Sequence, residues 1–116
     1  MERHLVVASS DLGRVSISTG AIERIVGLAA AESYGVVALA GRGRLSRLVP
    51  WGIRKGVDVE EREDGLAVEV RVVVERGLKL AEVATAVRER VRYELERMVG
   101  LPLAGVEVHI ERVRGG

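Results

Sequence analysis

The sequence VDVEEREDGLAVEVRVVV, Val57 to Val74, decides how this chain folds. Apolar and polar residues alternate on both sides of Asp64-Gly65, as they do in strands that are buried on one face. Asp-Gly is a favoured pair at the centre of a two-residue hairpin turn, where both residues need a positive φ. The segment therefore predicts an antiparallel hairpin.

The segment that follows the hairpin carries the clearest helical pattern in the chain. Apolar residues recur every three or four positions, which makes one stripe along about five helical turns. Gly100 and Pro102 end this helix, and the alternation from Val106 to Val113 predicts a last strand. The stripe consists of Leu80, Val83, Ala84, Val87, Val91, Leu95 and Met98.

Three further elements are predicted before the hairpin. The alternation of Arg14 to Ser18 predicts a strand, and a helical pattern then runs from about Gly20 to Ser33. Thr19 is a suitable N-cap for this helix. The apolar run from Val36 to Ala40 lies between glycines, which is typical of a central strand covered on both faces.

The predicted order is β-α-β-β-β-α-β, and each helix separates two strands that can lie parallel. We therefore expect an α+β fold with two layers, in which two helices cover one face of a mixed sheet. One domain should span residues 1–116, with a core at about 13–113 and an insert at 41–56. The other face of the sheet should present charges to water, namely Glu69, Arg71, Glu107, His109 and Glu111.

Composition limits the functional classes. The formal net charge is +1, so the chain as a whole has no electrostatic field that would recruit nucleic acid. The absence of cysteine removes disulfides and thiolate nucleophiles and suits a cytoplasmic protein. The apolar run at the start is too short for a secretory signal or a membrane span.

The sequence predicts no catalytic, cofactor-binding or metal-binding residues. The serines lack the GxSxG pattern of an exposed nucleophile, and His4 and His109 lie far apart in the chain. Glu107, His109 and Glu111 would share one face of the last strand. Neighbours on that face are roughly 7 Å apart, which is wide for joint coordination of one ion unless a neighbouring strand contributes.

The insert GRGRLSRLVPWGIRKG, Gly41 to Gly56, is apolar and strongly basic. One interpretation is an amphipathic turn that covers part of the domain's own core. A second is a binding surface for a protein partner, with weak contact to an anionic membrane. A third is a DNA or RNA contact, although the sheet offers no pair of aromatic residues for base stacking. The candidate partner-binding residues are Arg42, Arg44, Leu45, Arg47, Leu48, Trp51, Arg54 and Lys55.

Several segments together resemble the alkaline shock protein family, also called envelope stress response proteins. They are GAIERIVGLAAAESYGVVALAGR, the KGV that opens the hairpin, RGLKLAEVA at the start of the second helix, and MVGLPLAGVEVHI at its end. The resemblance covers about residues 13–113. It implies a non-enzymatic bacterial adaptor that is cytoplasmic or held at the inner face of the membrane and acts in cell-envelope or fatty-acid homeostasis. Its expected partners are a small membrane-anchor protein or an enzyme of lipid metabolism.

Two functional classes are consistent with the residues and with the family resemblance. The first is an adaptor that binds proteins through the insert and an exposed edge of the sheet, and we also expect it to form homo-oligomers. The alternative is a regulatory protein that binds RNA or DNA through the basic insert.

Overall fold

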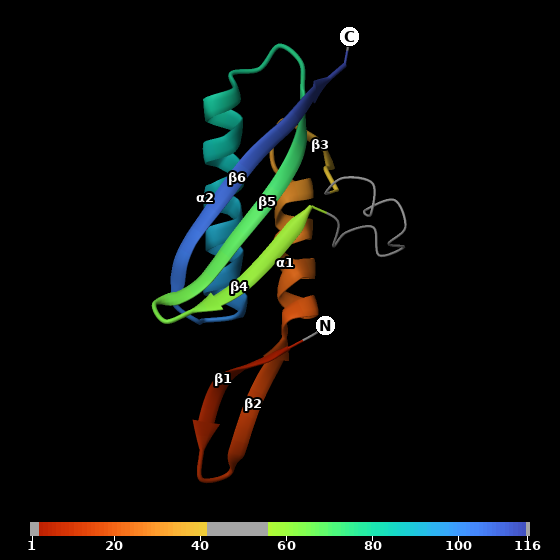
Figure 1. Cartoon of the computed structure of the whole chain (residues 1–116). Coiled ribbons are helices and arrows are strands. Elements are labelled where there is room, and N and C mark those ends of the chain that lie inside the picture. Colours follow the sequence, from red (N-terminus) through yellow and green to blue (C-terminus); the bar gives the residue numbers. More distant parts are fainter. Residues whose placement is uncertain (1–2, 42–55, 116) are drawn as a thin grey trace.

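A computed structural model describes residues 3–41 and 56–115 of the chain. These residues form an α+β fold in the order β-β-α-β-β-β-α-β (Figure 1). The elements are β1 (His4–Ser10), β2 (Gly13–Ser18), α1 (Thr19–Ala31), β3 (Val36–Leu39), β4 (Val57–Arg62), β5 (Gly65–Glu75), α2 (Leu80–Met98) and β6 (Leu103–Arg114).

The main sheet is built around β5. On one side β5 pairs in parallel with β6, and on the other side it pairs antiparallel with β4 and β3. β4 lies along Gly65 to Val70, and β3 lies along Val72 to Val74. β3 and β4 therefore follow each other along one edge of β5. The predicted antiparallel hairpin and the mixed sheet are both confirmed. The two turn residues of the hairpin are Glu63 and Asp64 rather than Asp64 and Gly65, because Gly65 already pairs with Arg62, and Asp64 does not have a positive φ.

The strand predicted at Val36 to Ala40 is at the edge, and not at the centre, of this sheet. β3 has four residues, and within the described part of the chain it pairs only with β5. The central position belongs to β5, which has neighbours on both sides and whose Val70, Val72 and Val74 are fully buried. The apolar character of β3 does not distinguish these positions, because a short edge strand can also pack against a helix.

Both helices cover the same face of the main sheet (Figure 1). α1 begins after Ser18, whose hydroxyl accepts a hydrogen bond from the backbone N–H of Ala21 at 3.0 Å. This contact satisfies one of the N–H groups that a helix leaves free at its start. The cap is thus one residue earlier than the predicted Thr19.

The central part of the predicted α2 stripe forms the core contact with the sheet. Val83, Val87, Val91 and Leu95 are at most 1% exposed. Burial of each such side chain contributes about 1.5–3 kcal/mol. The two ends of the stripe, Leu80 and Met98, stay in part exposed. The four buried residues of α2 and the buried residues of α1 pack on the valines of β5 and form one core.

The N-terminal residues form a hairpin that the sequence analysis did not predict. β1 pairs antiparallel with β2 in a separate two-stranded sheet that projects from the start of α1 (Figure 1). Leu5 and Ile17 attach its base to the core. The pairing of the Arg14 to Ser18 strand with β1 means that this strand does not join the main sheet, and the parallel pairing across α1 is not formed.

Candidate functional site

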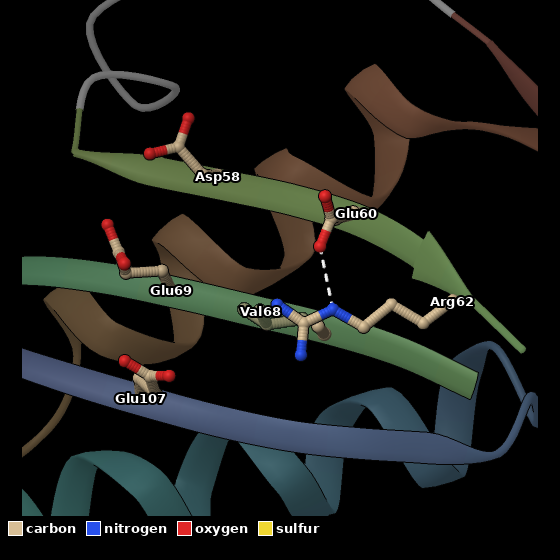
Figure 2. A pocket seen from close by; sticks show the side chains of 7 residues that line it. Asp58, Glu60, Arg62, Val68, Glu69 and Glu107 are labelled. Carbon is tan, nitrogen blue, oxygen red and sulfur yellow. Dashed lines mark hydrogen bonds and ion pairs between the residues drawn. The ribbon is translucent and has the colours of Figure 1, made fainter. Parts of the chain in front are cut away.

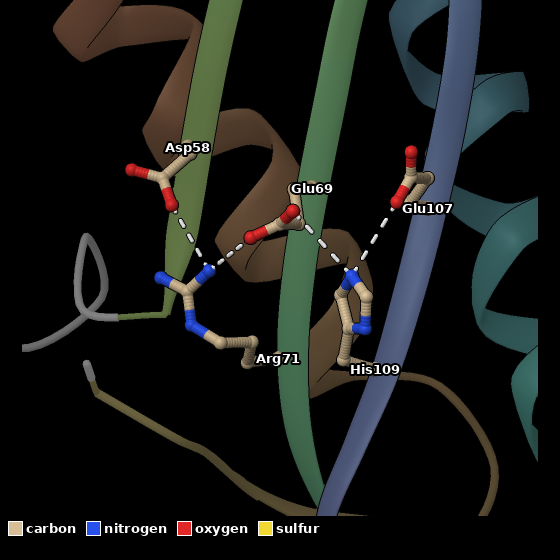
Figure 3. A network of polar contacts seen from close by, with 5 residues as sticks. All are labelled: Asp58, Glu69, Arg71, Glu107 and His109. Atoms are coloured by element: carbon tan, nitrogen blue, oxygen red, sulfur yellow. Dashed lines mark hydrogen bonds and ion pairs between the residues drawn. The ribbon is translucent and has the colours of Figure 1, made fainter. Parts of the chain in front are cut away.

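The outer face of the main sheet, which points away from the helices, gathers ionisable side chains from three strands (Figure 3). Asp58 of β4 lies opposite Glu69 of β5, and Glu69 lies opposite Glu107 of β6. Two residues further along, Arg71 lies opposite His109. Because side chains alternate between the two faces of a strand, these registers place all five on one face. We call them the outer-face network.

Arg71 is the buried member of the outer-face network. Its side chain is only 8% exposed, whereas that of Asp58 is 50% exposed. The Arg71 Nη1 donates hydrogen bonds to Asp58 Oδ2 at 2.9 Å and to Glu69 Oε1. The expectation that Arg71 faces water is therefore wrong. Two carboxylates on neighbouring positions compensate the charge of the buried guanidinium, although its Nε has no hydrogen-bond partner.

The backbone of Arg71 also holds both ends of the insert. Its carbonyl oxygen accepts a hydrogen bond from the Ala40 N–H at 2.8 Å, and its N–H donates to the Gly56 carbonyl at 2.8 Å. Ala40 and Gly56 are thus hydrogen-bonded to the same residue. Gly56 has a φ of +82°, and a Cβ there would lie 2.5 Å from the Ala40 carbonyl oxygen. Only glycine fits this close approach without strain.

The eight candidate partner-binding residues of the insert, Arg42 to Lys55, lie outside the described residues. Their role in partner binding stays a prediction.

An acidic hollow of about 170 Å³ lies on the same outer face (Figure 2). Its polar lining comes from Asp58, Glu60, Glu69, Glu107 and one cation, Arg62. Arg62 Nε donates to Glu60 Oε1 at 2.7 Å, and this hydrogen bond raises the pKa of Arg62. Four carboxylates and one arginine in the lining make this surface unfavourable for phosphate groups.

His109 joins the last two strands of the outer-face network. Its Nε2 lies 3.4 Å from Glu69 Oε2 and 3.5 Å from Glu107 Oε1. The ligand atoms of Glu69, Glu107 and His109 lie within 4.8 Å of one another. These side chains are of the types that bind zinc. The third side chain of this group is Glu69 of the neighbouring strand, and not Glu111 as the sequence on one strand suggested.

Three of the described serines take structural roles. The hydroxyl of Ser33 donates to the Ala29 carbonyl at 2.8 Å, and that of Ser18 caps α1. Ser10 accepts a hydrogen bond from the Leu12 N–H. Among the described residues, the hydrogen bonds of these three hydroxyls therefore join backbone groups and do not prepare a nucleophile.

The link from Arg71 to Asp58 and Glu69 was missed in the sequence. The alternation of each strand already places these residues on the outer face. Glu69 and Arg71 are two residues apart on β5, and Asp58 reaches Arg71 across the β4–β5 hairpin, so the link depends on the register of that hairpin, which the alternation of each strand does not define.

Comparison with known proteins matches residues 7–115 to the model of the alkaline shock protein 23 family, described as having a cell envelope-related function. The chain belongs to this family. The resemblance found in the sequence is thereby confirmed, and a cell envelope-related function follows from membership. Nothing in this family assignment indicates catalysis.

Two bacterial relatives illustrate the similarity. The chain is 35% identical over 102 residues to YqhY, an uncharacterized protein of Bacillus subtilis (strain 168), covering 85% of this chain and 76% of the relative. It is 32% identical over 107 residues to the uncharacterized protein Spy1614 of Streptococcus pyogenes serotype M6, covering 88% of each chain.

A solved structure of a variant of the MamM CTD has a similar fold. The TM-score is 0.53 at 12% sequence identity, and the similarity covers 84% of this chain and 96% of that chain. At this level of identity the comparison concerns the fold alone. Within the described residues, neither helix is both long and apolar enough to span a bilayer.

Proposed function

We propose that this protein is a non-enzymatic adaptor that acts in cell-envelope or fatty-acid homeostasis through contacts with other proteins at the inner face of the membrane. Its membership of a cell envelope-related family supports the cellular context. The adaptor role rests on the observation that ionisable side chains of the outer-face network are paired with one another.

The observation that carries the proposal is that the outer-face network is internally paired. Arg71 binds two carboxylates, and His109 lies between two more oxygens of the same face. An acid, a base or a nucleophile in an active site is instead directed at a place where a substrate can sit. The nearby hollow is shallow and lies on an exposed sheet face (Figure 2). These features suit a surface for contact better than a reaction site.

Two parts of the molecule are proposed as contact surfaces. One is the basic insert, whose ends are both held at Arg71. The other is the edge of β6 that faces away from β5. Contact of the insert with bare lipid would be weak, because its apolar stretch is short. A protein partner, such as a small membrane-anchor protein or an enzyme of lipid metabolism, is therefore the proposed ligand.

Binding of RNA or DNA is the competing function. A nucleic acid would have to avoid the outer face, since Asp58, Glu60, Glu69 and Glu107 repel phosphate groups. The strand faces that RNA-binding modules use carry aromatic residues for stacking. Here the outer-face network occupies that position.

Titration of the purified protein separates these classes. The probes are phosphatidylglycerol vesicles, duplex DNA and single-stranded RNA, each at low and high salt. The proposal predicts at most weak vesicle binding that high salt removes, and no tight binding to either nucleic acid. Tight, salt-dependent binding to RNA or DNA would contradict it and favour the competing function.

A further inference from the structure

β6 leaves one long edge of the main sheet without a partner strand among the described residues. It has 12 residues and pairs only with β5. Along the opposite edge, β3 and β4 are separate strands that pair with different parts of β5. β6 therefore offers the longer continuous row of backbone groups for another strand.

Two bulges limit the part of this edge that can pair regularly. Relative to β5, β6 has one extra residue at Ala104 and another at Glu111. Bulges interrupt a ladder and protect an edge from open-ended association. The regular stretch is Gly105 to Ile110, which is long enough for one short ladder.

A hollow of about 370 Å³ lies between α2 and β6, next to the start of this stretch. The hollow is lined by Arg88, Glu89, Arg92, Glu96, Leu103, Gly105 and Val106.

The side chains of the stretch complement a second copy of themselves. If two β6 strands pair antiparallel about Val108, Glu107 of each copy lies opposite His109 of the other. On the helix-facing side, Val106 then lies opposite Ile110, and Val108 lies opposite itself. Residues directly opposite each other in an antiparallel pair share a face and interact. Both faces of this pairing are therefore matched.

Other pairings of the same two strands are less favourable. A shift of one residue places apolar side chains against the polar face. A shift of two residues places Glu107 opposite either Glu107 or Glu111 of the second copy, and a parallel arrangement again places Glu107 opposite Glu107. Like charges directly opposite each other destabilise a sheet. The antiparallel register centred on Val108 is therefore favoured over these neighbouring pairings.

We propose that a second copy of this chain pairs antiparallel along β6, with a two-fold axis at Val108, so that the two sheets become continuous. The proposal deepens the proposed adaptor function, on which it rests, by naming the surface through which the adaptor assembles. A two-fold arrangement uses the same surface on both copies and therefore closes at a dimer.

Charge exchange at Glu107 and His109 tests this pairing by sedimentation of the full chain. Wild type should be a dimer. The variant Glu107→Lys and the variant His109→Glu should each weaken self-association about tenfold or more. In the first, lysine lies opposite His109 at two places in every dimer, and in the second, glutamate lies opposite Glu107 at two places. An equimolar mixture of the two variants should form a mixed dimer, because lysine then faces glutamate. The double variant should again dimerise with itself.

Glu63→Lys in the β4–β5 turn and Ser16→Glu on β2 are exposed away from β6, and these matched controls should leave the dimer unchanged. Circular dichroism reports whether each variant is folded. A monomeric wild type, single variants that dimerise like wild type, or a mixture that forms no mixed dimer would each overturn the proposal.

The outcomes separate the dimer from the adaptor function. A monomeric wild type that still captures partners through its insert overturns only the β6 pairing. A β6 dimer whose partners do not depend on the insert overturns the insert-dependent adaptor function and leaves the pairing in place.

Discussion

The free energy of unfolding should respond very differently to loss of Arg71 and to loss of its two carboxylate partners in the outer-face network. Arg71 is the desolvated member, whereas the side chains of Asp58 and Glu69 are 50% and 33% exposed. When Arg71→Met removes the cation, water can reach both carboxylates, and the methionine can still fill the space of the arginine stem. When Asp58→Asn and Glu69→Gln are combined, a buried guanidinium loses both of its counter-charges.

The expected magnitudes follow from this difference in burial. In Arg71→Met, two partly solvated contacts worth about 0.5–1 kcal/mol each are lost. Removal of the unpartnered Nε offsets part of this loss, so the free energy of unfolding should fall by about 1 kcal/mol. The double neutral variant should lose about 2–4 kcal/mol, somewhat less than the cost of an uncompensated buried charge, because amide oxygens still accept hydrogen bonds.

Urea unfolding at neutral pH, followed by circular dichroism, measures both changes. Adding Arg71→Met to the double neutral variant should recover at least about 1 kcal/mol, because the buried cation is then gone. The reasoning would be refuted if Arg71→Met were as destabilising as the double variant, or if the effects of the three substitutions simply added.

Three further changes have defined outcomes. Gly56→Ala should lower the free energy of unfolding by about 1–3 kcal/mol more than Gly100→Ala, since both have a positive φ but only Gly56 lies against backbone; equal losses in urea unfolding would be inconsistent with this contact. Leu95→Ala should cost about 2–5 kcal/mol in the same assay, and a negligible loss would contradict its burial. A hydrogen bond from Arg97 lowers the pKa of Glu94, so its stabilisation is present at neutral pH and is lost as the pH falls through the folded-state pKa. In an NMR titration Arg97→Met should raise the pKa of Glu94 toward its ordinary value, and an unchanged pKa would exclude this cause.

The sequence predicted the elements whose local signals agree with their packing. The Asp64-Gly65 pair marks a turn between two alternating segments, and the α2 stripe has one period along its whole length. Such signals come from residues close together in the chain and do not depend on tertiary packing. This is why β4, β5, α2 and β6 were predicted, together with their arrangement in two layers.

The features that were missed either lack a local pattern or depend on contacts between strands. The run LVVA in β1, from Leu5 to Ala8, does not alternate, so its pairing with β2 was not evident. The burial of Arg71 follows from its place on the central strand, which its own alternating segment does not reveal. In the same way Glu69 joins His109 through the parallel register of β5 and β6, so the candidate site could be predicted only as a charged face.

Protein contact through the insert is the central claim, and crosslinking followed by affinity capture from cells tests it most directly. Three proteins are compared. They are the wild type, an insert variant with Arg44→Glu, Arg47→Glu and Arg54→Glu, and a control variant with Arg14→Glu, Arg24→Glu and Arg76→Glu. The three arginines of the control are exposed and lie outside the insert. The account predicts that wild type and control capture the same envelope-associated or lipid-metabolism proteins, while the folded insert variant loses them. An unchanged set of partners in the insert variant would contradict it.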